Sequence, residues 1–178
     1  MVGCFLSLAL ALNTVVAHSL HAEANKNGEI PSLSRGESKK ITIGEVEDVV
    51  LVPWGISLPA RVDTGADLSS LDARDVSVRN NLADFGLGPR YGASRLQLPV
   101  VGTRRVRTSM GTEERPVVEV SICLGSKLFR TLATLRDRSE MTYPFLVGRS
   151  ALNGSFLVDT SRSRAAQPSC PAGSLVAN

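Results

Sequence analysis

The chain is poor in histidine, and this limits the chemistry available to it. Of its 178 residues only His18 and His21 are histidines, and both lie close to the N-terminus. No HExxH or similar ligand cluster is present, so the sequence argues against a catalytic zinc site. A Ser-His-Asp or Cys-His triad lacks its base for the same reason. We therefore expect no metal site and no cofactor.

Aromatic residues and nucleotide-binding motifs are also scarce. Phe, Trp and Tyr make up 4% of the chain, which is too little for the base-stacking surface of a nucleic-acid-binding protein. The sequence has neither a GxxxxGK[ST] loop nor a GxGxxG fingerprint, so ATP chemistry has no visible site. The formal net charge is only +3, which points to no specific partner. We expect no nucleic-acid partner.

Long apolar runs are missing as well. The uncharged apolar run over residues 5–17 is shorter than the roughly 20 residues that a membrane-spanning helix needs. It fits the h-region of a secretory signal, with small-residue cleavage patterns after it, although no Lys or Arg precedes it. A buried N-terminal helix is the alternative. The favoured interpretation predicts a signal peptide over residues 1–24, a periplasmic or secreted location, and no membrane span in the mature chain.

After the signal, the pattern is that of a small β domain. Residues 25–40 are polar and contain Gly and Pro, which is typical of a flexible leader. Short β-branched segments separated by glycines then follow, and residues 117–124 alternate like a half-buried antiparallel strand. We expect an all-β domain over residues 41–163, a small closed barrel or sandwich with one short C-terminal helix. Residues 164–178 are expected to form a loose tail.

Cysteine is rare, and two interpretations stay open for it. Cys4 lies in the expected signal, which leaves Cys123 and Cys170 in the mature chain. An oxidising compartment permits a disulfide between them. Alternatively, Cys123 is a small buried apolar residue of a strand.

What is present is a carboxylate in a distinctive context, Asp63-Thr64-Gly65-Ala66, which follows an apolar strand-like segment. These residue types are ordinary turn formers, so a plain β-turn is one interpretation. The other is half of an aspartic peptidase site, in which two close carboxylates share a proton and act as base and acid on water and the substrate carbonyl. The second carboxylate then comes from a two-fold related subunit. Gly65 allows the tight turn, and the Thr64 hydroxyl can hydrogen bond across the two-fold axis.

Three segments together carry a family resemblance. They are RVDTGADLSSLDA over residues 61–73, SMGTEERP over residues 109–116, and LRDRSEMTYPFLVGRSALNGSFLVDTSRS over residues 135–163. This combination resembles the retropepsins, which are dimeric retroviral-type aspartic peptidases. It resembles more closely the bacterial retropepsin-like family commonly labelled ATP-dependent zinc proteases. The match covers about residues 44–163, and no residues here suit the zinc or the ATP of that label.

The resemblance implies a retropepsin-like fold and assigns roles to the loop. Asp63 is the expected catalytic carboxylate, one from each subunit of a homodimer. Thr64, Gly65 and Ala66 are expected to support the catalytic loop. The implied partners are therefore a second copy of the chain and a peptide or protein substrate.

The resemblance also implies binding and structural residues around the catalytic aspartate. Gly65, Asp67 and Ser69 are expected to bind substrate, and Asp67 is expected to pair with Arg149. A buried bidentate pair would rigidify the floor of the site. The alternative is an exposed ion pair that contributes less than about 1 kcal/mol. The chain departs from the family pattern at Leu68, where threonine is usual.

A second feature of the resemblance is a substrate-covering flap, which we place within residues 84–112. This stretch is rich in arginine. It forms either a solvated strand face or a surface that meets an acidic substrate or envelope polymer. Asp137-Arg138-Ser139 is typical of the family pattern, but the sequence suggests no mechanism for it.

The sequence thus predicts an exported aspartic endopeptidase of retropepsin type that acts as a homodimer. The main alternative is a non-catalytic envelope-binding or scaffold module on the same fold, because a fold does not guarantee an activity. A monomer that binds envelope polymers through its arginines is a further alternative.

Overall fold

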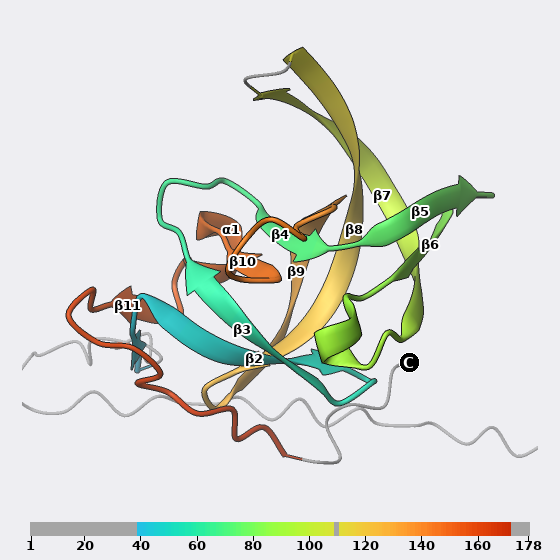
Figure 1. Cartoon of the computed structure of the whole chain (residues 1–178). Helices are drawn as coiled ribbons and strands as arrows, with labels where there is room; N and C mark the ends of the chain where they lie inside the picture. Colours follow the sequence, from blue (N-terminus) through green and yellow to red (C-terminus); the bar gives the residue numbers. More distant parts are fainter. Residues whose placement is uncertain (1–38, 109–110, 172–178) are drawn as a thin grey trace, which may run out of the picture. The chain divides into compact units, whose positions relative to one another are not determined.

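The computed structural model describes residues 39–108 and 111–171 (Figure 1). The expected signal peptide over residues 1–24 and nearly all of the leader over residues 25–40 lie outside the described residues, so both stay predictions. Among the described residues, no helix is long and apolar enough to cross a membrane.

The described part of the chain consists of short strands with one 3-10 turn and one short α-helix. Their bounds are β1 (Ile41–Ile43), β2 (Val46–Val52), β3 (Ile56–Val62), β4 (Ser69–Asp72), β5 (Arg74–Arg79), β6 (Leu82–Gly86), η1 (Pro89–Tyr91), β7 (Arg95–Thr108), β8 (Gly111–Leu124), β9 (Lys127–Arg136), β10 (Phe145–Val147), α1 (Arg149–Leu152) and β11 (Phe156–Val158). The expected all-β class with one short C-terminal helix is confirmed.

Most strands belong to one mixed sheet in the order β2-β3-β10-β4-β9-β8-β7-β6-β5, while β1 and β11 form a separate parallel pair. Strand β2 also pairs with β8, so the six strands from β2 to β8 in this order form a closed circuit of pairings. Strands β7, β6 and β5 continue from β8 as an open extension (Figure 1). The six-stranded part of the sheet is thus closed on itself, while β7, β6 and β5 lie outside the closed circuit.

The longest elements are β7 and β8, each of 14 residues, which pair from Val100 and Val118 out to Thr108 and Gly111. A register shift between Val100 and Gly102 interrupts the hairpin near its base. Figure 1 shows the distal end of the hairpin reaching beyond the neighbouring strands. The stretch in which we expected the flap contains β7 and the start of β8, and the role of this hairpin as a flap stays a prediction.

The alternation predicted for residues 117–124 is present in β8. One face of the strand is at most 1% exposed and belongs to the core: Val118, Val120, Ile122 and Leu124. On the other face Val117 and Cys123 are buried, whereas Glu119 is exposed and Ser121 is half-buried. The strand thus has one core face and a second face that is covered only in part.

The C-terminal segment over residues 164–171 is not loose, which corrects the expectation for the described part of the tail. Glu47 on β2 is fully buried. Its carboxylate accepts hydrogen bonds from the amides of Ala165 (2.9 Å), Ala166 (3.1 Å) and Gly44 (2.5 Å). A buried carboxylate requires such donors, and the C-terminal segment supplies two of them. The tail composition alone does not reveal this partner.

A disulfide between Cys123 and Cys170 attaches the same segment to β8. The Ser169 amide also donates to the Gly125 carbonyl at 2.8 Å. Of the two interpretations of Cys123, the disulfide is the one that the structure has, and it explains why the outer face of β8 is covered at this end.

Candidate active site

The loop with the predicted catalytic aspartate joins β3 to β4. Asp63 follows the last residue of β3 directly, and its amide donates to the Val147 carbonyl of β10 at 3.0 Å. Strand β10 lies between β3, to which it is parallel, and β4, to which it is antiparallel. The loop is therefore anchored at both ends to the same short strand, which keeps its backbone close to the segment that follows β10.

The Asp63 side chain is oriented by its own loop. One carboxylate oxygen, Oδ1, accepts from the amides of Gly65 at 2.9 Å and Ala66 at 3.1 Å. A Cβ on Gly65 would stand 3.1 Å from this oxygen, so glycine suits the position. The other oxygen, Oδ2, has no hydrogen-bond partner among the described residues, and the side chain is only partly buried. One oxygen is thus held while the other is available.

The second expected landmark, Gly148-Arg149, lies directly against this loop. A Cβ on Gly148 would collide with the Leu68 carbonyl group, so only glycine permits this close approach. The Gly148 amide donates to Ser69 Oγ at 3.2 Å, and the Arg149 amide donates to the Ala66 carbonyl at 2.8 Å. The structure brings these two sequence motifs together, as the resemblance implied.

The Arg149 side chain supports the loop mainly through backbone carbonyls. Its Nη1 donates to the carbonyls of Thr64 (3.1 Å) and Gly65 (2.7 Å). Arg149 Nη2 lies 3.6 Å from Asp67 Oδ1, and both side chains are more than half exposed. Asp67 also contacts Arg104 at 3.2 Å. The expected pair forms, but as the exposed alternative rather than as a buried bidentate pair, because the guanidinium is directed toward the loop carbonyls.

Thr64 and Ser69 lie in different environments. Thr64 is exposed, which leaves its hydroxyl accessible to a second subunit. Ser69 is fully buried, and its hydroxyl accepts the Gly148 amide. A fully buried side chain offers no surface to a substrate, so the geometry favours a structural role for Ser69 over the expected substrate contact. The catalytic roles of the loop residues stay predictions.

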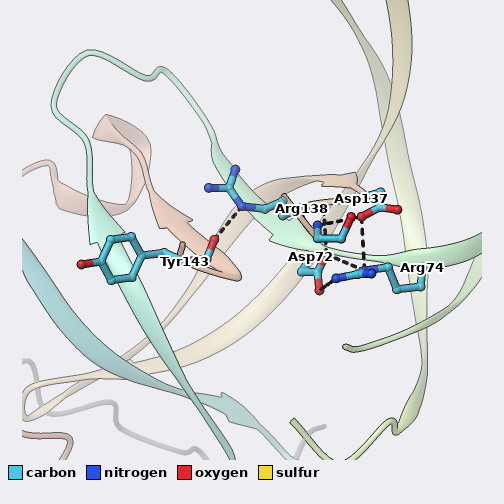
Figure 2. A network of polar contacts seen from close by, with 6 residues as sticks. Asp72, Arg74, Asp137, Arg138 and Tyr143 are labelled. Atoms are coloured by element: carbon cyan, nitrogen blue, oxygen red, sulfur yellow. Dashed lines mark hydrogen bonds and ion pairs between the residues drawn. The ribbon is translucent and has the colours of Figure 1, made fainter. Parts of the chain in front are cut away.

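A second polar cluster lies nearby, and sequence reasoning missed it (Figure 2). Asp72, at the end of β4, is only 2% exposed. Its carboxylate accepts from Arg74 Nε at 2.9 Å and Arg74 Nη2 at 3.0 Å, and from the Arg138 amide at 2.7 Å. The Asp72 hydrogen bond is the main reason that the pKa of Arg74 is raised. This cluster connects β4, β5 and the segment after β9.

The Asp137-Arg138-Ser139 motif belongs to the same cluster. The Asp137 carboxylate accepts the Ser139 amide at 2.7 Å and contacts Arg74 at 3.3 Å. Hydrogen bonds from Ser139 are the main cause that lowers the pKa of Asp137. Arg138 Nε donates to the Tyr143 carbonyl at 3.0 Å. Asp72 and the Asp137-Arg138-Ser139 motif lie in two of the segments that carry the family resemblance. This resemblance was the only sign of the cluster in the sequence.

Most arginines of the expected flap stretch fit the solvated-face alternative. Arg95 pairs with Asp84, and Arg105 pairs with Glu114 at 2.9 Å, with both arginines more than half exposed. Arg104 differs, because it reaches Asp67 in the loop of the predicted catalytic aspartate. Across residues 39–108 and 111–171, no group of three or more His, Cys, Asp or Glu side chains is placed to hold a metal ion.

Comparison with known proteins agrees with this architecture. The fold matches the crystal structure of a Legionella pneumophila protein of unknown function with a TM-score of 0.63 and 26% identity, over 71% of this chain and 98% of that one. Residues 90–169 match the family model described as "Retropepsin-like aspartic endopeptidase RimB". Over these residues the chain is similar to the RimB-like family. The resemblance predicted from the sequence is confirmed.

The curated relatives that the chain matches are longer proteins. It is 35% identical over 136 residues to a probable alpha-L-glutamate ligase of Parasynechococcus marenigrum, and 32% identical over 134 residues to one of Shewanella pealeana. These alignments cover 71% and 70% of this chain but only 29% of each relative. The chain thus spans less than a third of the relatives that it matches. The residues matched by the family model begin after the Asp63 loop.

Proposed function

We propose that the protein is a retropepsin-type aspartic endopeptidase that hydrolyses peptide bonds as a homodimer, with Asp63 of each subunit forming the catalytic dyad. The observation that carries this proposal is the Asp63 carboxylate. Its Oδ1 is held by the amides of Gly65 and Ala66, while Oδ2 has no partner in the described part of the chain. A pre-oriented carboxylate with a free oxygen, on a partly exposed loop, suits general acid-base chemistry.

The chemistry requires a second carboxylate close to the first. Two aspartates in contact cannot both ionise, so they share one proton. The ionised one takes a proton from water as the water attacks the peptide carbonyl, and the protonated one donates its proton to the carbonyl oxygen. An isologous dimer brings the same residue of both subunits to one axis. The exposed Thr64 beside Asp63 supports such a contact.

We also propose that the protein acts outside the cytoplasm. The apolar run over residues 5–17 and the Cys123–Cys170 disulfide both support export, because disulfides persist in oxidising compartments. Determining the N-terminal sequence of the protein purified from its native cells tests this. A start close to residue 25 is the expected result, and an intact Met1 in a cytoplasmic fraction contradicts it.

The glutamate ligase named in the relatives is not proposed for this chain. The alignment covers only 29% of those proteins, so the ligase activity in their names applies to proteins that are mostly made of other sequence. The alternative to the peptidase is a non-catalytic module on the same fold.

The test is cleavage of a diverse peptide mixture, followed by mass spectrometry from acidic to neutral pH. We compare the mature protein with Asp63→Asn and with Asp75→Asn as the matched control. Asp75 is exposed and has a φ of 50°, a conformation that asparagine tolerates well. Cleavage by the wild type and the control but not by Asp63→Asn supports the proposal. Equal cleavage by all three rules out Asp63 as the catalyst, and well-folded dimers that cut nothing favour the non-catalytic module.

A further inference from the structure

The C-terminal part of the described chain forms a strap that lies against β2. This strap, residues 159–170, follows β11 and is neither helix nor strand. In Figure 1 it is the red segment that leaves β11 and runs below β2. Its apolar side chains are few and small, and Ala166 packs against the hydrophobic core. Little apolar burial holds the strap in place, so its position depends on hydrogen bonds and on the Cys123–Cys170 disulfide.

The first half of the strap holds the turn between β1 and β2. The Glu45 amide donates to the Arg162 carbonyl at 2.8 Å, and the Arg164 amide donates to the Val46 carbonyl at 2.6 Å. A Cβ on Gly44 would collide with the Arg162 carbonyl group, so glycine permits this close approach. The position of the turn therefore depends on the strap.

The same turn holds the strand that leads into Asp63. The Val62 amide donates to the Glu45 carbonyl at 2.9 Å, and Arg61 Nη1 lies 3.3 Å from the Glu45 carboxylate. On the other side of this strand, the Asp63 amide donates to the Val147 carbonyl of β10 at 3.0 Å. The end of β3 is thus fixed on one side by β10 and on the other by a turn that the strap holds.

A cavity beside Asp63 has the strap as part of its wall. Its volume is about 410 Å³, and its lining includes Asp63 and Thr64 from the predicted catalytic loop and Val158 and Thr160 from β11 and the strap. A movement of the strap therefore changes the surroundings of Asp63 directly, as well as through the β1–β2 turn.

Opposing contributions act on the closed strap. Glu47 is fully buried, and two of its three amide donors, Ala165 and Ala166, belong to the strap, which favours closure. Against closure, Arg164 has a φ of 49°, in the left-handed region that arginine rarely adopts. Such strain persists only where the surroundings impose it. The disulfide joins positions 47 residues apart, and a covalent link of this length restricts the open chain.

The disulfide lies where an external thiol can approach it. Cys170 is half-buried in the strap, whereas Cys123 on β8 is only 4% exposed. Thiol–disulfide exchange begins with attack on one of the two sulfurs. Access from the side of Cys170 is therefore sufficient for reduction.

We propose that Cys123 and Cys170 form a redox site that controls the Asp63 loop. This inference rests on the proposed peptidase function. As a disulfide, the pair closes the strap over the β1–β2 turn, which fixes the end of β3 and the Asp63 loop in the catalytic arrangement. A dithiol reductant opens the pair: it supplies two electrons and two protons, becomes a disulfide itself, and leaves two cysteine thiols. The strap then releases both the turn and the cavity wall.

This redox site makes activity follow export. In a reducing cytoplasm the chain carries two thiols, and the Asp63 loop lacks the support of the strap. In an oxidising compartment a disulfide oxidant takes two electrons and two protons from the thiols, and the strap closes. The peptidase thus becomes active only where its own disulfide forms, and proteins of the cytoplasm are not cut before export.

Hydrogen–deuterium exchange of the full-length protein tests the redox site without any substrate. The oxidised protein is compared with protein reduced by dithiothreitol in the absence of denaturant, and thiol alkylation with mass spectrometry verifies the reduction of Cys123 and Cys170. We expect reduction to speed amide exchange at least tenfold over residues 43–47 and 61–63. Exchange in β5 and β6, which pair with each other and continue to β7, should stay within twofold, which separates local release from global unfolding.

A variant without the disulfide gives an independent measurement. We expect Cys170→Ser to exchange like the reduced wild type over residues 61–63 and not to respond to dithiothreitol. The matched control is Ser169→Ala, since Ser169 is exposed and its amide, which the substitution retains, donates to the Gly125 carbonyl. This control should behave like the wild type. If Cys170→Ser does not fold, reduction and reoxidation of the wild type decide the matter.

Three results overturn the inference. The first is unchanged exchange over residues 61–63 in fully reduced protein. The second is an equal rise in β5 and β6, which means that reduction destabilises the whole domain. The third is a disulfide that dithiothreitol reduces only in denaturant.

Cleavage assays separate the failure of this inference from the failure of the proposed function. We expect reduction to lower kcat for peptide cleavage at least tenfold and oxidised glutathione to restore it. If the oxidised protein cuts peptides and reduction changes neither kcat nor exchange, the redox site fails and the peptidase stands. If exchange over residues 61–63 responds to reduction but the oxidised protein cuts no peptide, the peptidase fails and the redox-controlled strap stands.

Discussion

Asp63 and Asp72 lie in one short segment of the chain, yet the fold uses their carboxylates in opposite ways. Asp63 is partly exposed, and only its Oδ1 is hydrogen bonded. Asp72 is 2% exposed, and both of its oxygens accept hydrogen bonds, from Arg74 and from the Arg138 amide. The donors around a carboxylate therefore decide whether it is available for chemistry.

The two sets of donors also differ in their origin. The donors to Asp63 are amides two and three residues further along the chain, so the turn itself orients the side chain. One donor to Asp72 lies 66 residues away and reaches it only through the pairing of β4 with β9. The hydrogen bonds to Asp63 are therefore local to its turn, whereas those to Asp72 need the complete fold.

The largest expected effect comes from Asp63→Asn. Because asparagine cannot act as general base or acid, kcat/KM for peptide cleavage should fall about 10³-fold or more. The free energy of unfolding should change by less than about 1 kcal/mol, since the side chain is partly exposed and its Oδ1 acceptor is retained. Steady-state kinetics and urea denaturation measure the two quantities. A large loss of stability in Asp63→Asn contradicts the conclusion that Asp72, but not Asp63, supports the fold.

Asp72→Asn should show the reverse pattern. The substitution removes a charge that holds Arg74 and the Arg138 amide in a buried cluster, so the free energy of unfolding should fall by about 2–3 kcal/mol. Cleavage per folded molecule should stay within about one order of magnitude, because Asp72 does not face the Asp63 loop chemistry. Denaturation curves together with activity normalised to the folded fraction check this. Unchanged stability shows that the cluster is not structural.

Arg149→Gln tests how much the Asp63 loop depends on support from outside. Its guanidinium donates to two loop carbonyls, so its loss should lower kcat/KM about tenfold through a less ordered loop. The cost to folding should be only about 1 kcal/mol, because the side chain is exposed. The control is Arg130→Gln, since Arg130 is 73% exposed and paired with Glu119. Equal kcat/KM values for Arg149→Gln and Arg130→Gln indicate that the Asp63 loop is ordered without support from Arg149.

The smallest effect concerns pH and Asp137, at the exposed edge of the Asp72 cluster. Hydrogen bonds from Ser139 lower its pKa below the usual 3.8. Its contribution to stability is therefore present above the unfolded pKa and is lost as the pH falls through the lower folded pKa. Asp137→Asn should remove this dependence, with a change below about 0.5 kcal/mol because the group is exposed. Parallel denaturation series from pH 6 down to about pH 2.5 measure it.

Sequence reasoning was most successful where the relevant contacts are local. The alternation of β8, the strand before Asp63, and the turn around Gly65 all follow from spacings of two or three residues. It was least successful for the C-terminal segment, whose polar composition suggested a loose tail. Glu47 and Cys123 hold that segment in place from far along the chain, and neither contact has a local signature.

By itself, the sequence determined the strand-rich class, the short terminal helix, the family resemblance and the Asp63 turn. These depend on side-chain periodicity, glycine conformations and hydrogen bonds between near neighbours. Only the tertiary structure decided that both oxygens of Asp72 are hydrogen bonded in a buried cluster and that the Arg149 side chain donates to loop carbonyls. The same holds for the placement of Arg104, Arg115, Arg136 and Arg138 around one cavity. Such features arise when strand pairing brings distant residues into contact and burial then makes every unpaired charge costly.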